Sequence, residues 1–222
     1  MEWKHIMIQI QKKMQSVLYY LLNDICGKFD AIALKSFIDY LFVLSEKIII
    51  HFPKMLPLYI DYYNDIIDQE SNIAQITSIS KVLHVGCGSI PASSILLAEK
   101  TKASIIGMDK DDRAIRNAEI CLQNLGMSQK VKVKKTDSLE MDLSEFDVIL
   151  ISQGIIPKED FMQKLADKLS VDTIVILRSF SQDELLDSSD NFLHDCYNII
   201  DIFYHKKHGS TSSIILKKKK MV

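Results

Sequence analysis

The segment from residue 81 to residue 95 constrains the fold of this chain more than any other. A run of mostly apolar residues, 81–85, is followed by the turn Gly86-Cys87-Gly88, and Pro91 then opens an apolar-periodic stretch. Proline suits the first turn of a helix, and glycines let backbone N–H groups approach a ligand at the positive end of that helix. The segment therefore predicts a strand, a tight glycine turn and a helix.

A second buried strand, 103–109, follows about 20 residues later and ends in Asp109, where a carboxylate can accept both hydroxyls of a ribose. A dinucleotide site would have a third glycine at position 91, but the chain has Pro91 there. This disfavours NAD and FAD and leaves S-adenosylmethionine (SAM), which has a ribose but no pyrophosphate. The alternative is a glycine turn in some other α/β domain.

The composition is that of a globular protein with no dominant charge. The chain has 222 residues, of which 47% are hydrophobic, and a net charge of −2, so no overall field favours nucleic acid. Its four cysteines are far apart and show no metal-ligand spacing, which fits reduced thiols in a cytoplasmic protein without a metal site. No signal peptide is evident and the apolar stretches are too short to span a membrane, so we expect no membrane partner.

Residues 1–78 show helical periodicity and no strand signal. Gly27 and the prolines near residue 55 divide the region into three predicted helices, the last over 59–76. From residue 79 to 222 strands and helices alternate instead. We therefore expect an N-terminal helical subdomain or lid, 1–78, and a Rossmann-like SAM-binding catalytic domain, 79–222. The apolar N-terminal helices could supply a homodimer interface.

The predicted fold class is α/β, a Rossmann-like and mostly parallel sheet. Its last two strands, 197–204 and 212–216, are joined by so short a loop that they must be antiparallel. Five alternating strands closed by such a hairpin form the sheet of class I SAM-dependent transferases. Lys217 to Lys220 is expected to be a solvated basic tail. The five alternating strands are predicted at 81–85, 103–109, 131–134, 146–151 and 173–177, with helices from Pro91, from Asp111 or Asp112 to Gly126, from Pro157 to Leu169, and near 182–193.

Polar residues at the carboxyl ends of these strands are the candidates for holding SAM. Gly86, Cys87 and Gly88 are expected under its methionine part, with Cys87 as a small turn residue and not a nucleophile. Asp109 is expected at the ribose. Two further pairs complete the prediction: Asp137 and Ser138 at the adenine, and Ser152 and Gln153 along the pocket.

Several segments resemble nicotianamine synthase and its microbial relatives that make opine-type metallophores. The turn with Pro91 is similar to that family's Gly-Ser-Gly-Pro-Leu-Pro. The match continues, in order, at Phe52-Pro53 with the Tyr63-to-Glu70 spacing, at Phe146-Asp147-Val148-Ile149, at Leu177-Arg178-Ser179, and at Phe203-Tyr204-His205 with Ser212-Ser213-Ile214-Ile215. The resemblance implies transfer of the 3-amino-3-carboxypropyl group of SAM to a small-molecule amine or amino acid, with release of 5′-methylthioadenosine.

Such a transfer needs a deprotonated amine, and the resemblance assigns the base to Glu70, with Tyr63 on the same helix face. Arg178 would clamp an acceptor carboxylate, and His205 would lie beside it. Three of these residues have a structural alternative: Glu70 could be a solvent-facing acid, Arg178 could form a structural ion pair, and His205 could be a structural histidine. A SAM-dependent small-molecule methyltransferase and a non-catalytic SAM-binding or helical interaction protein are the alternative functions.

Overall fold

A computed structural model describes residues 44–155, 158–179, 192–205 and 212–220. The chain divides into two compact units, Met1–Ser45 and Glu46–Val222, and the description that follows concerns the second. The predicted helices before residue 43, most of the helix near 182–193 and the loop at 206–210 lie outside the described residues. The predicted domain boundary between residues 78 and 79 stays a prediction.

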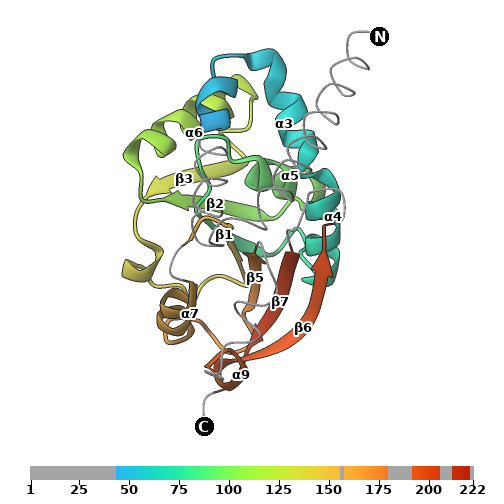
Figure 1. Ribbon diagram of the computed structural model, residues 1–222, viewed down its shortest axis with the longest axis vertical. Helices are drawn as coiled ribbons and strands as arrows, with labels where there is room; N and C mark the ends of the chain where they lie inside the picture. The colour runs from blue at the N-terminus through green and yellow to red at the C-terminus, as the bar shows by residue number, and fades with distance from the viewer. Residues whose placement is uncertain (1–43, 156–157, 180–191, 206–211, 221–222) are drawn as a thin grey trace, which may run out of the picture. The chain divides into compact units, whose positions relative to one another are not determined.

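A seven-stranded sheet in the order β3-β2-β1-β4-β5-β7-β6 forms the centre of the unit (Figure 1). All neighbouring pairs are parallel except β5–β7 and β6–β7, which are antiparallel. The predicted sheet and its closing hairpin are thus confirmed. The strands are β1 (Lys81–Val85), β2 (Ser104–Asp109), β3 (Val131–Lys135), β4 (Val148–Ile151), β5 (Ile174–Ser179), β6 (Tyr197–Tyr204) and β7 (Ser212–Lys218).

Helices cover both faces of this sheet and bury two apolar cores. One core packs side chains of α3, α4, α5 and α6 against the sheet, and the other packs α7 and α9. Among the described residues no helix is both long and apolar enough to cross a membrane. The helices are α3 (Leu56–Tyr62), α4 (Asn64–Ile73), α5 (Ala92–Thr101), α6 (Asp112–Asn124), α7 (Lys158–Ala166) and α9 (Phe192–Cys196), with short 3₁₀ turns η1 (Pro53–Met55) and η2 (Ser138–Glu140) and a helical segment at 44–49.

Helix α6 begins and ends at the predicted residues, whereas the predicted helix over 59–76 is divided in two. Asp111 caps α6 by accepting a hydrogen bond from the Arg113 backbone N–H, and Gly126 follows its end with φ +67°. The single helix over 59–76 is wrong, because the chain forms α3 and α4 with Tyr63 between them. The Tyr63 N–H bonds to the Ile60 carbonyl, three residues before it, so a tighter turn separates the two helices.

One face of the sheet changes from apolar to polar toward its carboxyl edge. Ile176 of β5 pairs with Ile215 of β7, and both lie in the apolar core. Two residues further along β5, Arg178 pairs with Ser213, and Ser152 follows β4 at the same edge. Side chains two apart in a strand share a face, so the sheet presents a row of polar groups where its apolar core ends.

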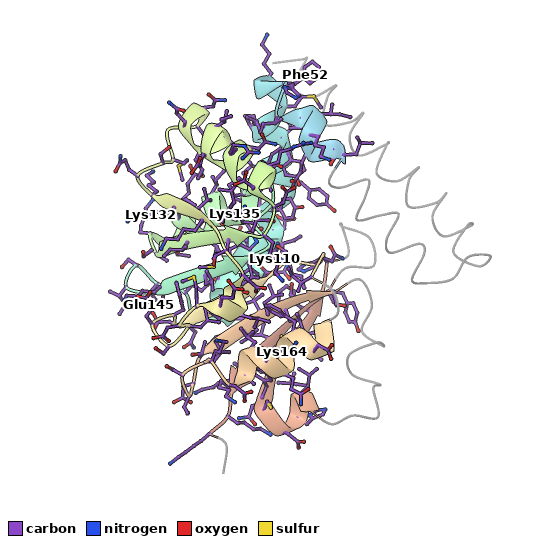
Figure 2. The ribbon with its side chains drawn as sticks, turned by 90° about the vertical axis from the view of Figure 1, so that its left-hand side faces the viewer. Phe52, Lys110, Lys132, Lys135, Glu145 and Lys164 are labelled. Carbon is purple, nitrogen blue, oxygen red and sulfur yellow. The ribbon has the colours of Figure 1, made fainter. Side chains whose placement is uncertain are left out.

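The outer strand β3 is rich in lysine. It carries lysines at three of its five positions, and Figure 2 shows Lys132 and Lys135 on the side facing the viewer. Lysines on an edge strand oppose pairing with the edge of another sheet. The lysines of β3 therefore have a structural reason to be where they are.

The expected solvated tail at Lys217 to Lys220 is wrong for Lys218. Strand β7 continues to Lys218, which pairs with Tyr197 of β6 and is only 4% exposed. Its Nζ lies 5.8 Å from the centre of the Tyr197 ring. The long apolar stem of lysine and its attraction to an aromatic face allow it to continue the strand where the sequence suggested a free tail.

We expect Gly107→Ala to destabilise the fold by about 1–3 kcal/mol through overpacking. A Cβ at this position of β2 would lie 3.1 Å from the Cβ and Sγ of Cys87 and 3.2 Å from a methyl of Val133. Gly154→Ala is the matched control, because no atom lies within 4 Å of its added Cβ. Urea unfolding of both variants tests this, and equal stabilities would show that the close approach of Cys87 to β2 is wrong.

Candidate active site

The glycine turn after β1 is fixed by hydrogen bonds to the end of β2. Gly86 and Gly88 have φ of +75° and +69°, which residues with a Cβ rarely adopt. The N–H groups of Gly86 and Cys87 both donate to the Met108 carbonyl, and that of Gly88 donates to the Asp109 carboxylate at 3.0 Å. Hydrogen bonds therefore hold the glycine turn and Asp109, the predicted ribose acid, in a fixed arrangement. Pro91 caps α5 instead of occupying its first turn.

Cys87 points away from the turn's outer surface and into the sheet. Its side chain is 3% exposed and packs against Gly107. Burial, followed by the nearby carboxylates of Asp109 and Glu46, raises the pKa of the Cys87 thiol well above its ordinary value. The thiol is therefore protonated at neutral pH, and Cys87 offers a ligand its backbone only.

The residues predicted at the adenine and along the pocket lie at the ends of β3 and β4. Asp137 accepts a hydrogen bond from the Leu139 N–H at 3.0 Å and forms an ion pair with Lys110 at 2.8 Å. Within the described part of the chain, the Ser138 hydroxyl and the Gln153 amide nitrogen are buried without a hydrogen-bond partner. Buried polar atoms normally have partners, so these two are available to a bound molecule.

Glu46 lies against the same turn and was not predicted. Its carboxylate accepts hydrogen bonds from the Ser89 N–H and the Tyr59 hydroxyl, each at 2.9 Å, and it fills the space beside Gly88. Burial, with a smaller contribution from the negative charge of Asp109, raises the pKa of Glu46 to about 7. A carboxyl with this pKa can exchange a proton at neutral pH.

Three tyrosines are in contact with one another, and one of them, Tyr59, donates a hydrogen bond to Glu46. The Tyr59 hydroxyl lies 3.5 Å from that of Tyr63, and the Tyr62 and Tyr63 rings meet edge to face at 5.1 Å. Burial raises the pKa of Tyr59 and Tyr63 above the ordinary value, so both hydroxyls stay protonated and can donate hydrogen bonds.

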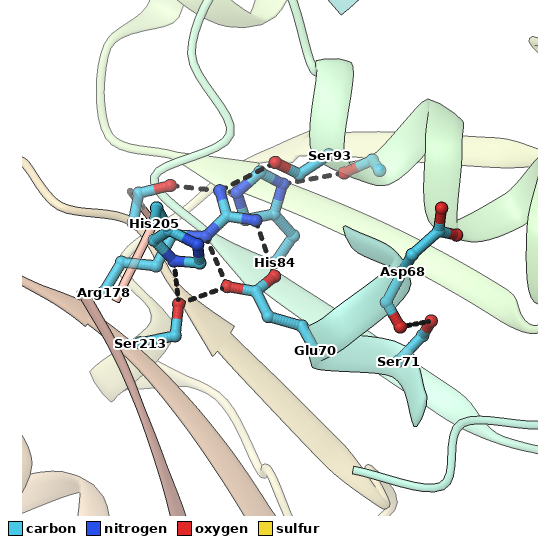
Figure 3. A network of polar contacts seen from close by, with 10 residues as sticks. Asp68, Glu70, Ser71, His84, Ser93, Arg178, His205 and Ser213 are labelled. Carbon is cyan, nitrogen blue, oxygen red and sulfur yellow. Dashed lines mark hydrogen bonds and ion pairs between the residues drawn. The ribbon is translucent and has the colours of Figure 1, made fainter. Parts of the chain in front are cut away.

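Glu70 and Arg178, which were predicted separately, form a buried ion pair (Figure 3). Arg178 Nε and Nη2 donate to the two oxygens of Glu70 at 2.8 and 2.7 Å, and Nη1 donates to the Ser93 hydroxyl at 2.8 Å. Glu70 is fully buried. The alternative of a solvent-facing Glu70 is wrong, whereas the ion-pair alternative for Arg178 is what the structure contains.

His205 joins this pair through Ser213. Its Nε2 lies 2.8 Å from the Ser213 hydroxyl, which in turn donates to Glu70 Oε1 at 2.7 Å. His205 is buried, and its ring meets that of Phe203 edge to face. The hairpin strands β6 and β7 thus bring His205 to the same polar cluster as Glu70 and Arg178.

His84 is a second residue that the sequence analysis did not select. Its ring nitrogens lie 2.8 Å from the Ser94 hydroxyl and 2.9 Å from that of Ser152. Burial, with a further contribution from Arg178, lowers the pKa of His84 to about 3, so the ring is neutral. A neutral ring accepts at one nitrogen and donates at the other, which fixes the Ser152 hydroxyl beside Gly86.

The candidate site therefore has two parts at the carboxyl edge of the sheet. One contains the glycine turn, Asp109 and Glu46, and the other contains Glu70, Arg178 and His205. Tyr63 connects them, because the Arg178 guanidinium lies 5.7 Å from the centre of its ring. No group of three or more His, Cys, Asp or Glu that could hold a metal occurs in the part of the chain that the structure describes.

Comparison with known families identifies the group to which this chain is related. The family model for the nicotianamine synthase protein matches residues 4–222. The chain belongs to the nicotianamine synthase family. The resemblance seen in its motifs is thus confirmed over nearly the entire sequence.

Three proteins to which this nicotianamine synthase family member is similar share little of its sequence. It is 26% identical over 121 residues to an L-histidine 2-aminobutanoyltransferase of Yersinia pestis, covering 54% of this chain and 45% of that protein. It superposes on a point mutant of MtNAS with a TM-score of 0.71 at 16% identity, covering 91% of this chain and 82% of the other. An RNA methyltransferase from Salinibacter ruber gives a TM-score of 0.57 at 16% identity, covering 71% and 93%.

These structural similarities establish the fold of the chain and do not establish its reaction. The match spans about half the length of the Yersinia pestis protein, 45%. A synthase and a methyltransferase both share the sheet, so the fold alone does not choose between the chemistries. For this member of the nicotianamine synthase family, the choice between the two reactions is therefore argued from its own site residues.

Proposed function

We propose that this protein transfers the 3-amino-3-carboxypropyl group of SAM to an amine and releases 5′-methylthioadenosine. The observation that carries the proposal is Glu46, a carboxyl with a pKa of about 7 placed directly on the glycine turn. A primary amine is mostly protonated at neutral pH and must lose a proton before it attacks carbon. A base of this pKa beside the donor site supplies that step.

The residues at the turn fit SAM as the donor. Gly86 and Gly88 would let the turn curve beneath its methionine part, and Asp109 would accept hydrogen bonds from the ribose hydroxyls. The partnerless Ser138 hydroxyl and Gln153 amide would face the adenine and the pocket wall. Asp137, which forms an ion pair with Lys110, would accept a hydrogen bond from the adenine amino group.

We assign the base to Glu46 and not to Glu70. Both Glu70 oxygens accept from the charged Arg178 guanidinium, and one also accepts from Ser213. Glu46 accepts hydrogen bonds from the Tyr59 hydroxyl and from backbone N–H groups at Ser89 and Ile90, and it lies against the turn. Tyr59 and Tyr63 would orient the amine and Glu46.

The reaction is an in-line displacement. Glu46 takes one proton from the acceptor's ammonium, and the freed nitrogen lone pair forms a bond to the γ-carbon of the donor's methionine chain. The carbon–sulfur bond breaks, and its electron pair returns to sulfur, which leaves as the neutral thioether methylthioadenosine. The sulfonium is already a good leaving group, so the protein contributes mainly position and proton removal.

We further propose that the acceptor is a small amine or amino acid and that the product is a metal-chelating, nicotianamine-type amino acid. The family membership supports this, and the partly buried tyrosines beside Glu46 form a wall suited to a compact organic acceptor. A homodimer and a cytoplasmic location stay predictions from the sequence.

The sulfur-containing product tests the proposal. The purified protein is incubated with SAM and single amino acids, and the products are separated by mass spectrometry. Methylthioadenosine is expected, with an acceptor heavier by one or more aminocarboxypropyl groups. S-adenosylhomocysteine with a methylated acceptor would instead show a methyltransferase, and intact SAM binding without turnover for any acceptor would favour a protein that only binds.

A further inference from the structure

The outer strand of the sheet, β3, combines a row of unpaired lysines with a hollow beside it. Lys130, Lys132 and Lys134 are exposed and form no ion pair with any residue that the structure describes. A hollow of about 300 Å³ lies between this strand and α6. Its lining consists of the apolar side chains of Leu122, Val131 and Val133, together with Glu119, Ser128 and the lysines at 132 and 134.

Alternate residues of β3 direct their backbone groups away from the sheet. The Thr136 N–H donates to the Asp109 carbonyl at 3.2 Å, although the strand register pairs Asp109 with Lys135. In a parallel ladder this offset means that the even-numbered residues of β3 bond to β2 and the odd-numbered ones face outward. Val133 and Lys135 therefore present the open N–H and C=O groups of an edge strand.

The side chains of β3 divide the strand into an apolar face and a basic face. Val131 and Val133 pack into the core that α6 covers, whereas Lys132 and Lys134 alternate with them and lie on the opposite face (Figure 2 labels Lys132). A segment that paired with β3 would place its own side chains on the same two faces. Its residues beside the valines would enter the hollow, and its residues beside the lysines would meet two uncompensated positive charges.

We propose that the outer edge of β3 is a docking surface for an extended segment of a partner protein in which apolar and acidic residues alternate. The segment would add a strand to the sheet, with its apolar side chains in the hollow and its carboxylates beside Lys132 and Lys134. Backbone hydrogen bonds to Val133 and Lys135 would supply affinity, and the alternating side chains would supply specificity. This surface contains none of the active-site residues, so its docking role does not depend on the proposed reaction.

A second copy of the chain fits this surface poorly. Pairing of β3 with the β3 of another copy would set lysines beside lysines, which is unfavourable. The other edge strand, β6, has a single acidic residue, Asp201, whose carboxylate already accepts from the Ile202 N–H. The lysines thus discourage pairing between copies, as on other edge strands, and they select a partner that carries acidic residues.

The test adds a capped synthetic peptide of alternating glutamate and valine to the ¹⁵N-labelled full chain. The NMR signals of β3 should shift most, above all the amides of Val133 and Lys135, whose N–H groups would gain hydrogen bonds. Lys132→Glu together with Lys134→Glu should weaken binding by about tenfold or more, because two attractions become repulsions.

A matched control changes the net charge equally but elsewhere on the surface. Lys54 in η1 and Lys164 in α7 are both exposed, and neither lines the hollow. Lys54→Glu together with Lys164→Glu should leave binding of the peptide nearly unchanged. Equal affinity of the wild type and the Lys132/Lys134 double variant for the peptide would overturn the docking surface and leave these lysines with only their protective role on the edge.

Two further peptides separate strand pairing from simple attraction between charges. A peptide of the same composition with its glutamates in one block has the same charge but cannot place its acids on one face. N-methylation of alternate peptide groups keeps every side chain but removes the donors that would bond to β3. Each should bind weaker by about tenfold or more, and equal binding of either peptide would overturn strand addition.

An oligonucleotide of uridylate tests in the same titration whether the lysines serve a nucleic acid instead. Strand β3 has no aromatic side chain on which a base could stack, so we expect no shift confined to β3. Shifts of β3 with the oligonucleotide but not with the peptide would overturn the inference in favour of a nucleic-acid site.

Discussion

Replacing Glu46 by glutamine should lower the rate of methylthioadenosine release at pH 7 by about a hundredfold or more, the usual contribution of a positioned general base. Glutamine keeps the size of the side chain but cannot take a proton. Because a free amine still attacks, the residual rate should grow with pH as the acceptor itself deprotonates. Initial rates between pH 6 and 10 measure both effects.

The same variant should gain stability relative to the wild type as the pH rises. The pKa of Glu46 is raised from 4.5 to about 7 in the folded protein, so between these values the folded chain retains a proton that the unfolded chain loses. The wild type therefore loses stability as the pH rises through this window, and the glutamine variant does not. At pH 8 compared with pH 4 the relative gain should be about 1–2 kcal/mol, since Glu46 is partly exposed and water screens part of the effect.

Glu119→Gln on the outer surface of α6 is the control for both measurements, because Glu119 is exposed and is not one of the site residues. It should change neither the rate nor the pH dependence of stability. Full activity of Glu46→Gln at pH 7 would remove Glu46 from the mechanism and return Glu70 to consideration as the base.

Glu70→Leu alone should destabilise the protein by about 3–5 kcal/mol, because it leaves the Arg178 guanidinium buried without its partner. Adding Arg178→Met should recover most of that loss. Urea unfolding of the two single variants and the double variant gives the coupling between the residues directly. Asp68→Leu, which breaks an ion pair exposed to water, should cost less than about 1 kcal/mol.

A small loss of stability in Glu70→Leu would mean that water or another group reaches Arg178 once Glu70 is gone. Equal losses in the single and the double variants would mean that the two residues act independently. Either result would contradict the buried pair as described.

The sheet could be predicted from the sequence because its signals are local. Each strand is a short apolar run, and the glycine turn, Pro91 and Asp111 mark the places where helices begin. The short loop before β7 decides the antiparallel pairing. The family resemblance also came from segments of a few residues each, which is why it could be recognised without a structure.

The site was only partly predictable because its chemistry depends on contacts between distant residues. Glu70 and Arg178 are 108 positions apart, and nothing in either segment shows that they pair. Glu46 is 43 positions from Ser89 and lies between a serine and a lysine in a helix, where an acid is usually solvent-exposed. His84 was hidden in an apolar strand, where a histidine has no distinctive pattern. Tertiary packing likewise divided the predicted helix at Tyr63 and buried Lys218.

The most direct test of the proposed activity is to follow both reactive groups of SAM in one experiment. SAM that carries ¹³C in its methyl group and ¹⁵N in the α-amino group of its methionine part is incubated with the protein and an amine acceptor. The account predicts that ¹⁵N appears in the enlarged acceptor while the ¹³C methyl stays on sulfur in methylthioadenosine. A ¹³C methyl on the acceptor, with ¹⁵N left in S-adenosylhomocysteine, would contradict aminocarboxypropyl transfer and establish methyl transfer.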